Sequence, residues 1–459
     1  MYWITQLFLF ILCCLMFKVS REYKVAILLL STICLDAVVL NFVPFGGSHY
    51  ILSHCFILSE IPYIRQHIKT LKKTIIYPLL LIAIIAAIVL LINSPHYNNN
   101  LTNTLRLFIT ELTGKYFAIC YAFISIRSMD NMKPVLKVSY YGLLILTAFG
   151  VLNFVTGRAW FIDTIGAHMT VAENWQDLGG KFTNSERFRV QAMFFNPFNY
   201  GYICILLLLL QLWGYVKKLV SKQQFYISVV CSIFGVLFCG CRTNILCCAI
   251  GIVVFVYYAY SMKQWIRYAI VGFFLCIIAY STVPIIQEKV DQTLTAFDAN
   301  SQTSGSSIDM RLLQYTAVLY HIRDHELFGR GLGFFNIDMG WGEAQMASLV
   351  DKDLYGLEGV VMSYLLERGI IGLLLYLAFY ATILYFLYRH RVIDKQTSAF
   401  GLSLVFAYLA FANMTGELNS VFPTLLLIGC CIKLLRIYKV QKREEYYKES
   451  IAAKNVSFH

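Results

Sequence analysis

Arg242 stands between two apolar runs in the segment FCGCRTNILCC (residues 238–248), and neither neighbouring run carries a charge. A guanidinium at membrane depth costs roughly 2.5–3.5 kcal/mol on insertion scales, so a residue of this kind usually has a function. Arginine binds phosphate oxygens through two parallel hydrogen bonds and does not lose its charge. Arg242 is therefore a candidate ligand for a phosphate or diphosphate group. The alternative is an interfacial arginine at a helix end, whose head group reaches the aqueous phase.

Further arginines fall in segments that we expect at the same membrane face. Arg187 and Arg189 precede an apolar run in SERFRVQAMFFNPFNYGYI, and Arg311 and Arg330 stand in a long polar loop at 285–356. Acidic residues outnumber basic ones in that loop, so these two arginines do not belong to a generally basic segment. Several arginines at one face, beside apolar helices, are suited to binding a lipid-linked diphosphate.

Glu358, in YGLEGVVMSYLLERGIIG, begins an apolar run at that same face. A carboxylate at a membrane mouth can accept a proton from a sugar hydroxyl, and partial burial favours this role by making the carboxylate more basic. The alternative is an acid at a helix N-terminus, where the helix dipole stabilises negative charge. Glu367 and Arg368 follow in the same run, and we interpret them as separate packing or interfacial residues.

Three weaker signals have structural explanations. Glu111 and Lys115 have the i,i+4 order that favours an ion pair. Asp351 and Asp353 resemble a metal-binding D-x-D, but no third ligand stands near them in the sequence, so we expect no metal and no cofactor. The segment GRGLGFF (residues 329–335) follows an expected surface helix rather than a strand, so we expect a tight turn or a close approach to a helix instead of a phosphate loop.

Membrane helices are the elements that must position these residues. The chain has 459 residues, of which 58% are hydrophobic and 14% charged, and its mean hydropathy is +0.63. A soluble domain carries about 25% charged residues. Apolar runs of about 20 residues, the length that crosses a bilayer as a helix, recur along the whole chain. The sequence therefore predicts an all-α polytopic membrane protein whose 14 cysteines are mostly thiols inside apolar runs.

We expect about 12–13 transmembrane helices, with the N-terminus outside and the C-terminus in the cytoplasm. They are placed near residues 2–18, 24–43, 48–64, 74–93, 104–126, 134–156, 197–216, 223–240, 243–260, 265–284, 357–388, 398–412 and 416–437. The chain thus divides into N-terminal helices (1–156), an outer loop (157–196), central helices (197–284), a large outer loop over the site (285–356), C-terminal helices (357–437) and a cytoplasmic tail (438–459).

The large outer loop is expected to contain an amphipathic helix lying on the membrane surface. Its apolar residues recur at helical spacing: Ile308, Leu312, Tyr315, Leu319 and Ile322.

The net charge of +12 reflects the membrane topology and does not indicate binding to nucleic acid. Basic residues cluster in every second segment between spans, as the positive-inside rule requires for cytoplasmic loops. We therefore expect a multi-pass protein of the bacterial inner membrane, with the lipid bilayer as a partner, no nucleic acid, and an active site that faces outside.

The arginine-bearing segments resemble those of the O-antigen polymerase/ligase superfamily, over about residues 185–385. RVQAMFFNPFNYGYI resembles the family's R-V-x-G-x-F-x-N-P-N segment, which places Arg189 on its arginine and Asn196 on its asparagine. CRTNIL resembles the S-R-T/S-G/A segment, which places Arg242 on the arginine and Cys241 where a serine is usual.

Two later segments extend the resemblance in the family's order. RLLQYTAVLYHIRDHELFGRGLGFF resembles a helix of the type R-x3-W that leads into P-L-F-G-x-G, with Arg311 on the arginine. LEGVVMSYLLERGIIGLLLYL resembles H-N-x-x-L-x-x-x-x-E-x-G-x-x-G, with Glu358 on the histidine and Glu367 on the later acid. Ligases of this superfamily place a histidine at the position of Glu358. Its absence favours the polymerase branch.

The resemblance implies a membrane glycosyltransferase that polymerises undecaprenyl-diphosphate-linked repeat units at the outer face of the inner membrane. Donor and acceptor would both be undecaprenyl-diphosphate-linked glycans, and a chain-length regulator is a candidate partner. Arg189 and Arg242, assisted by Arg311 and Arg330, would stabilise the departing diphosphate, and Glu358 would be the base. Arg187, Glu367 and Asn196 are candidates for supporting roles. The large outer loop would exclude water, because hydrolysis would waste the donor.

Three other functions remain open on the sequence alone. A ligase would transfer the finished glycan to a terminal acceptor, using the same face and the same donor. A flippase for lipid-linked oligosaccharides should carry charges along a central cavity, whereas the notable arginines here gather at one face. A non-catalytic assembly partner would keep polymer synthesis intact when Arg242 is replaced.

Overall fold

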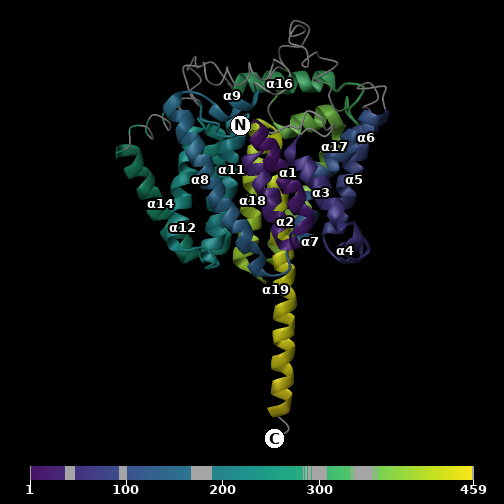
Figure 1. The fold of residues 1–459 in the computed structure, drawn as a ribbon, viewed down its shortest axis with the longest axis vertical. Helices are drawn as coiled ribbons and strands as arrows, with labels where there is room; N and C mark the ends of the chain where they lie inside the picture. Colours follow the sequence, from purple (N-terminus) through teal and green to yellow (C-terminus); the bar gives the residue numbers. More distant parts are fainter. Residues whose placement is uncertain are drawn as a thin grey trace.

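The structure, a computed structural model, describes residues 2–36, 47–92, 101–166, 189–282, 308–331 and 359–456, together with residues 284, 287, 291, 334, 354 and 357. Within these residues the chain forms helices and no strand, as expected for an all-α multi-pass membrane protein. Figure 1 shows the helices gathered into one bundle, with a long helix projecting from one end.

A helix occupies each predicted span. The bundle contains α1 (Tyr2–Lys18), α2 (Arg21–Cys34), α3 (Ser48–Glu60), α5 (Ile76–Ile92), α6 (Leu101–Glu111), α7 (Ala118–Ser125), α8 (Met132–Thr156), α11 (Pro197–Val216), α12 (Lys222–Phe238), α13 (Arg242–Ala259), α14 (Met262–Thr282), α17 (Val360–His390), α18 (Lys395–Thr415) and α19 (Val421–Val456). The helices α6 and α7 are joined by a π-helical turn, η2 (Leu112–Tyr116).

Fewer of these helices are full crossings by length than the sequence predicts. Six described helices are long and apolar enough to cross a membrane. A seventh arises if α3 with α4 (Ile64–Leu71) and the following α5, which meet at 107°, form one broken span. The other apolar helices of the described residues include α1 and α12, each of 17 residues. Short and bent elements account for part of the difference from the predicted number.

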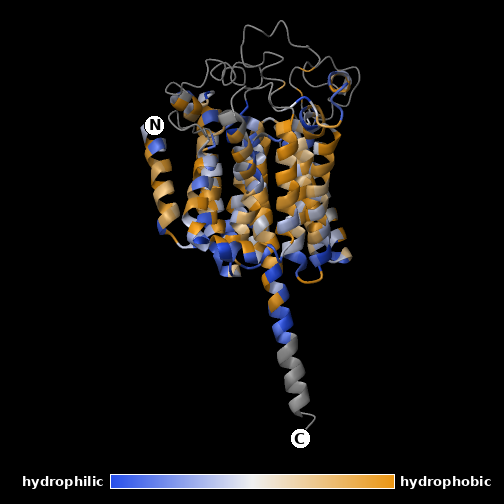
Figure 2. Cartoon of the chain, turned by 90° about the vertical axis from the view of Figure 1, so that its right-hand side faces the viewer, coloured by the Kyte–Doolittle hydropathy of each residue, from blue (hydrophilic) through white to orange (hydrophobic). Residues whose placement is uncertain are grey.

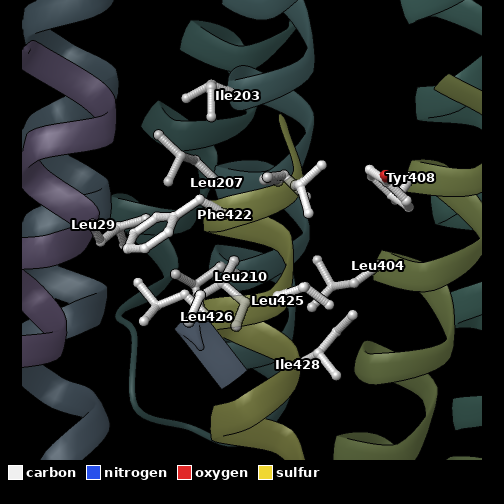
Figure 3. Packing of buried hydrophobic residues seen from close by; sticks show 14 of the residues in the cluster. Leu29, Ile203, Leu207, Leu210, Leu404, Tyr408, Phe422, Leu425, Leu426 and Ile428 are labelled. Carbon is white, nitrogen blue, oxygen red and sulfur yellow. The ribbon is translucent and has the colours of Figure 1, made fainter. Parts of the chain in front are cut away.

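The core of the bundle lies around α11, which is buried along nearly its whole length. Its run of leucines favours a helix, and Pro197 at the first helical position has the backbone angle that a helix needs. Figure 3 shows side chains from α2, α11, α18 and α19 packed together, among them Leu29, Ile203, Leu207, Leu210, Leu404, Phe422, Leu425 and Ile428. This packing fixes α11 against α18 and α19.

The outer helices carry apolar side chains on their exposed surfaces, as Figure 2 shows by colour. Examples are Phe10, Ile85, Val230, Phe274 and Leu374, all at least two-fifths exposed. A soluble protein rarely exposes apolar patches of this extent. This surface is the one that faces lipid.

The two ends of the bundle differ in what covers them. At one end lie α9 (Trp160–Gly166), α16 (Ile308–His321) and the start of α1, and we call it the loop end. At the other end lies α4, and α19 projects from it toward the C-terminus, so we call it the tail end. Hydrophilic residues gather at the tail end and along the projecting helix (Figure 2). The two termini therefore lie at opposite ends of the bundle.

The predicted amphipathic helix in the large loop is confirmed as α16. Leu312 and Leu319 are each 56% exposed, whereas Gln314 and Val318 are fully buried. The helix packs on α17. Its contacts with α17 and α18 hold it against the bundle, while Leu312 and Leu319 stay on its exposed side.

The helix α17 is broken at Gly369, where φ of +65° and ψ of −169° lie outside the helical region. The turn Glu326–Gly331, which follows α16, fills the break, and we call it the docked turn. Four backbone hydrogen bonds join it to α17: Arg330 N to Leu366 O (2.8 Å), Gly331 N to Glu367 O (2.9 Å), Ile370 N to Glu326 O (2.8 Å) and Ile371 N to Leu327 O (3.2 Å).

Two glycines make the docked turn sterically feasible. A Cβ on Gly329 would lie 2.5 Å from the backbone nitrogen of Arg368, and a Cβ on Gly369 would lie 2.4 Å from the carbonyl of Leu327. The prediction that GRGLGFF makes a close approach to a helix is confirmed at Gly329.

Candidate functional site

At the loop end, the first turns of α11 and α13 touch. In α13 the Asn244 side chain donates from Nδ2 to the carbonyl of Phe198 in α11, at 3.0 Å. Gly201 permits this approach, because a Cβ there would lie 2.1 Å from Nδ2 of Asn244. Helix N-termini carry unpaired N–H groups and a partial positive charge. Two such termini therefore meet at one place.

Arg189 and Arg242 both stand at this junction. The helix α13 begins at Arg242, directly after the turn Cys239–Cys241. Arg189 packs on that turn, since a Cβ on Gly240 would lie 3.0 Å from its Cγ, and its guanidinium lies 5.8 Å from the Phe198 ring centroid. The structure thus brings the two predicted ligands together. We call Arg189, Arg242 and the first turns of α11 and α13 the arginine corner.

The two helix N-termini in the arginine corner are capped differently. Asn196 caps α11, because its side-chain oxygen accepts from the backbone N–H of Phe198 at 2.7 Å. Cys241 holds the N-cap position of α13, but its thiol donates to the carbonyl of Cys239 and makes no cap hydrogen bond. Serine or threonine at that position would accept from the first turn. The N-terminus of α13 is thus the one that can offer N–H groups to a ligand.

The charge of Arg189, which the described residues leave uncompensated, favours an anion at the corner. Within the described parts of the chain, no carboxylate forms an ion pair with Arg189. Arg242 is half-buried at the beginning of α13. The positive ends of two helices add to these two guanidinium charges. An oxyanion bound here would meet side-chain and main-chain donors at once.

Arg311 and Arg330, which we expected to be further diphosphate ligands, contact helix ends. Nη2 of Arg311 donates to the carbonyl of Met414, one residue before the end of α18, at 3.2 Å. Nε of Arg330 donates to the carbonyl of His321, the last residue of α16, at 2.6 Å. Cations are favourable at helix C-termini, where carbonyl groups lack partners within the helix. Arg311 therefore ties α16 to α18, and Arg330 ties the docked turn to the end of α16.

Two predicted site residues, Glu358 and Arg187, lie outside the described residues. The neighbour of Glu358, Gly359, lies against the end of α18, where a Cβ would be 3.1 Å from the carbonyl of Asn413. Glu367 is half-buried beside the break in α17, and its carbonyl accepts from Gly331. The segments that carry Arg311 and Gly359 thus reach the same end of α18.

A buried charge network lies inside the bundle, beside the break in α17. Nη2 of Arg368 lies 2.7 Å from Oε1 of Glu111, whose Oε2 lies 3.0 Å from Nζ of Lys115. Lys115 also lies 2.8 Å from Oε2 of Glu417. The predicted pair of Glu111 and Lys115 is confirmed. The interpretation of Arg368 as a separate packing or interfacial residue is wrong, because its guanidinium is 2% exposed and ion-paired.

The network is neutral, and tyrosines satisfy its remaining acceptors. The hydroxyls of Tyr364 and Tyr408 donate to Oε1 of Glu417, at 2.8 and 3.2 Å. The guanidinium of Arg368 lies 4.1 Å from the Tyr364 ring centroid. The sequence places the charged Arg368 within an apolar run, and a charge inside such a run indicates a functional residue by itself. Its partner Glu111 is far away along the chain, and no local pattern could identify it.

The described residues offer ligands for an anion rather than for a metal ion. No group of three or more His, Cys, Asp or Glu side chains that could hold a metal occurs among them. The arginine corner, in contrast, supplies guanidinium groups and helix N–H groups at one end of the bundle. These groups can bind a phosphate and stabilise the charge that develops on a phosphate leaving group.

One comparison with known proteins matches part of the chain to a family. A family model described as O-antigen ligase matches residues 227–377, from α12 to the middle of α17. This segment includes Arg242, Arg311 and Arg330 but ends before α18 and begins after Arg189. No curated protein matches the chain.

Proposed function

We propose that this protein is a Wzy-type polysaccharide polymerase. The premise is its membership of the O-antigen polymerase/ligase superfamily, which the match over residues 227–377 supports. The superfamily implies a membrane glycosyltransferase-like enzyme that acts on lipid-linked glycans. In our proposal the growing glycan leaves its undecaprenyl-diphosphate carrier and joins the non-reducing end of another lipid-linked repeat unit. The loop end of the bundle then faces outside, because basic residues such as Lys69, Lys72 and Arg443 belong to α4, the turn after it and the projecting part of α19, all at the tail end.

The arginine corner is the observation that carries this proposal. The acceptor hydroxyl attacks the anomeric carbon of the donor, and the bond from that carbon to the diphosphate oxygen breaks. Undecaprenyl diphosphate departs with the electron pair, so negative charge develops on its oxygens. Arg189, Arg242 and the N-terminus of α13 stabilise that charge in a site walled by apolar helices, where such interactions are strong. The energy of the reaction comes from the glycosyl diphosphate itself.

Glu358 is the proposed base for the acceptor hydroxyl, in a single inverting displacement. Its neighbour Gly359 lies at the end of α18, where Arg311 also binds. In this proposal Arg311 and Arg330 act by holding α16 and the docked turn over the loop end. A loop held in this way excludes water from the donor.

The test uses a strain that lacks its polymerase but keeps the matching repeat-unit pathway. Wild type, Arg242→Ala and Glu358→Gln are expressed at matched membrane levels, and the glycolipids are separated on a gel. Arg267→Ala is the control, because Arg267 is an exposed arginine of α14 away from the arginine corner. We expect a ladder from wild type and the control, and single-repeat species from both site variants. If Arg242→Ala keeps the full ladder, Arg242 is an interfacial anchor and the proposed site is wrong.

A second candidate function is ligation of the finished glycan to a terminal acceptor. The description of the matching family model, O-antigen ligase, favours it. Glu358 stands against it, because ligases of this superfamily place a histidine there. The same strain distinguishes the two functions. If wild type produces no ladder but restores transfer in a ligase-deficient strain, the protein is a ligase.

A further inference from the structure

A cavity of about 1000 Å³ opens at the tail end of the bundle, far from the arginine corner. It lies between the turn that joins α4 to α5, the helix α7, the C-terminal end of α17 and the part of α19 that leaves the bundle. Ligand pockets of drug size measure about 300–1000 Å³. This cavity is therefore larger than a bare phosphate ion requires.

The lining of the cavity is strongly basic. Five cations line it: Lys72, Lys73, Arg436, Lys439 and Arg443, against a single carboxylate, that of Glu444. Within the described residues, none of these five forms an ion pair. The positive-inside rule explains why basic residues occur at this end, but it does not require them to converge on one cavity.

Arg436 gives the cavity an unsatisfied donor. Its Nη1 atom is buried and has no hydrogen-bond partner. Its guanidinium lies 5.8 Å from the Phe123 ring centroid, which fixes the stem at the cavity wall. A buried donor without an acceptor is unfavourable, so a native structure normally provides an acceptor for it. An anion in the cavity would be that acceptor.

The lining also includes apolar side chains, those of Ile75, Pro78, Phe386, Ile432 and Val440. A soluble anion would leave this apolar wall uncovered, whereas acyl chains would cover it. The cavity therefore offers both phosphate-binding groups and apolar surface.

The neighbouring helix α4 places the cavity at the depth of lipid head groups. Its apolar residues Ile64 and Ile68 are 49% and 45% exposed, and none of its residues is buried. Basic residues Arg65 and Lys69 stand beside them. A helix with this composition lies in a membrane interface, with its apolar side in the acyl region. The turn after α4, which supplies Lys72 and Lys73, then lies among the head groups.

We propose that this cavity binds an anionic glycerophospholipid of the leaflet at the tail end. The phosphodiester accepts from Arg436 and the surrounding lysines, and the acyl chains lie along the apolar wall. Basic pockets between transmembrane helices on the cytoplasmic side bind anionic lipid head groups by the same chemistry. The site holds a structural lipid where α19 leaves the bundle, and it does not rest on the function proposed for the loop end.

The test measures lipid preference of the purified full-length protein in detergent. Wild type is titrated with phosphatidylglycerol, phosphatidylcholine and inorganic phosphate, and bound lipid is counted by native mass spectrometry. Lys439→Gln/Arg443→Gln removes two exposed cavity cations without changing buried packing, and Arg436→Gln removes the unsatisfied donor. Lys263→Gln/Arg267→Gln is the matched control, since it removes two exposed cations of α14 outside the cavity.

We expect wild type and the control pair to prefer phosphatidylglycerol over phosphatidylcholine. The cavity pair should lose roughly 30-fold in that preference, the fold-change for two cations at about 1 kcal/mol each. Unchanged melting temperatures without lipid show that the cavity pair is folded. Equal losses in the cavity and control pairs would overturn the proposal, because the binding would then be a property of the whole basic end. Displacement of phosphatidylglycerol by equimolar inorganic phosphate would also overturn it, in favour of a soluble anion.

Discussion

Replacing Gly369 with alanine should release the docked turn from α17. The backbone of Gly369, at φ +65° and ψ −169°, lies in a region that essentially only glycine occupies, and alanine there costs about 1–3 kcal/mol. Its Cβ would also lie 2.4 Å from the backbone carbonyl of Leu327, so the backbone itself must move. The substitution thus acts at the contact between α17 and the turn Glu326–Gly331.

The magnitude follows from the bonds that hold the turn. Four backbone hydrogen bonds join it to α17, and each contributes roughly 0.5–1.5 kcal/mol net. We take the lower bound of each range, about 0.5 kcal/mol for each of the four bonds and about 1 kcal/mol for the backbone strain. The free energy of docking is then weakened by about 3 kcal/mol. That is roughly a 100-fold change in the population of the undocked turn.

Trypsin cleavage after Arg330 measures docking without measuring activity. The N–H groups on both sides of this site, those of Arg330 and Gly331, are bonded to α17 in the docked state. We expect cleavage in proteoliposomes to be at least tenfold faster for Gly369→Ala than for wild type. Gly157→Ala is the control, because Gly157 has a φ of +63° but open space around it. Equal cleavage rates for Gly369→Ala and wild type would refute the docking argument.

Three further predictions concern the buried network, the helix cap and the helix contact. Glu111→Gln or Arg368→Gln alone should each destabilise the protein by about 3–5 kcal/mol because a buried charge loses its partner. The double variant should recover part of the lost stability. If the decreases in melting temperature of the two single variants simply add in the double variant, the two side chains are not coupled. Asn196→Ala should lower the stability by about 1 kcal/mol, because the N-cap of α11 is lost. Asn196→Ser should keep the cap and therefore the stability. The activity per folded molecule should stay unchanged in both variants. Asn244→Ala should lower activity severalfold at nearly normal stability, because it frees the first turns of α11 and α13 from each other. If Asn244→Ala lowers the melting temperature but leaves the activity per folded molecule unchanged, Asn244 acts in folding alone.

The positions of the helices were predictable from the sequence because each span is an apolar run of nearly bilayer length. The lengths of the elements were not, since the chain breaks α17 at Gly369 and bends between α4 and α5 by 107°. The break depends on a turn that lies about 40 residues earlier in the sequence. Hydropathy carries no information on such a contact.

The site was predictable in part for a similar reason. Arg242 stands out because it is a charge flanked by apolar runs, and Arg189 lies before another such run. Their proximity depends on the turn at Gly240 and on the contact between Asn244 and Phe198. The second and third partners in the buried network, Arg368 and Glu417, come from segments distant in sequence from Glu111, so local spacing revealed only the pair with Lys115.

The most direct test of the arginine corner is the binding of a short-chain polyprenyl diphosphate to the purified protein in nanodiscs. Binding to wild type, Arg242→Ala, Arg189→Ala and the tail-end variant Lys439→Gln/Arg443→Gln is compared with binding of the corresponding monophosphate. We predict that wild type and the tail-end variant prefer the diphosphate, and that each arginine variant loses at least about tenfold in affinity, since charged hydrogen bonds contribute roughly 1.5–3 kcal/mol. Diphosphate affinity that is equal in wild type and in both arginine variants would contradict the account.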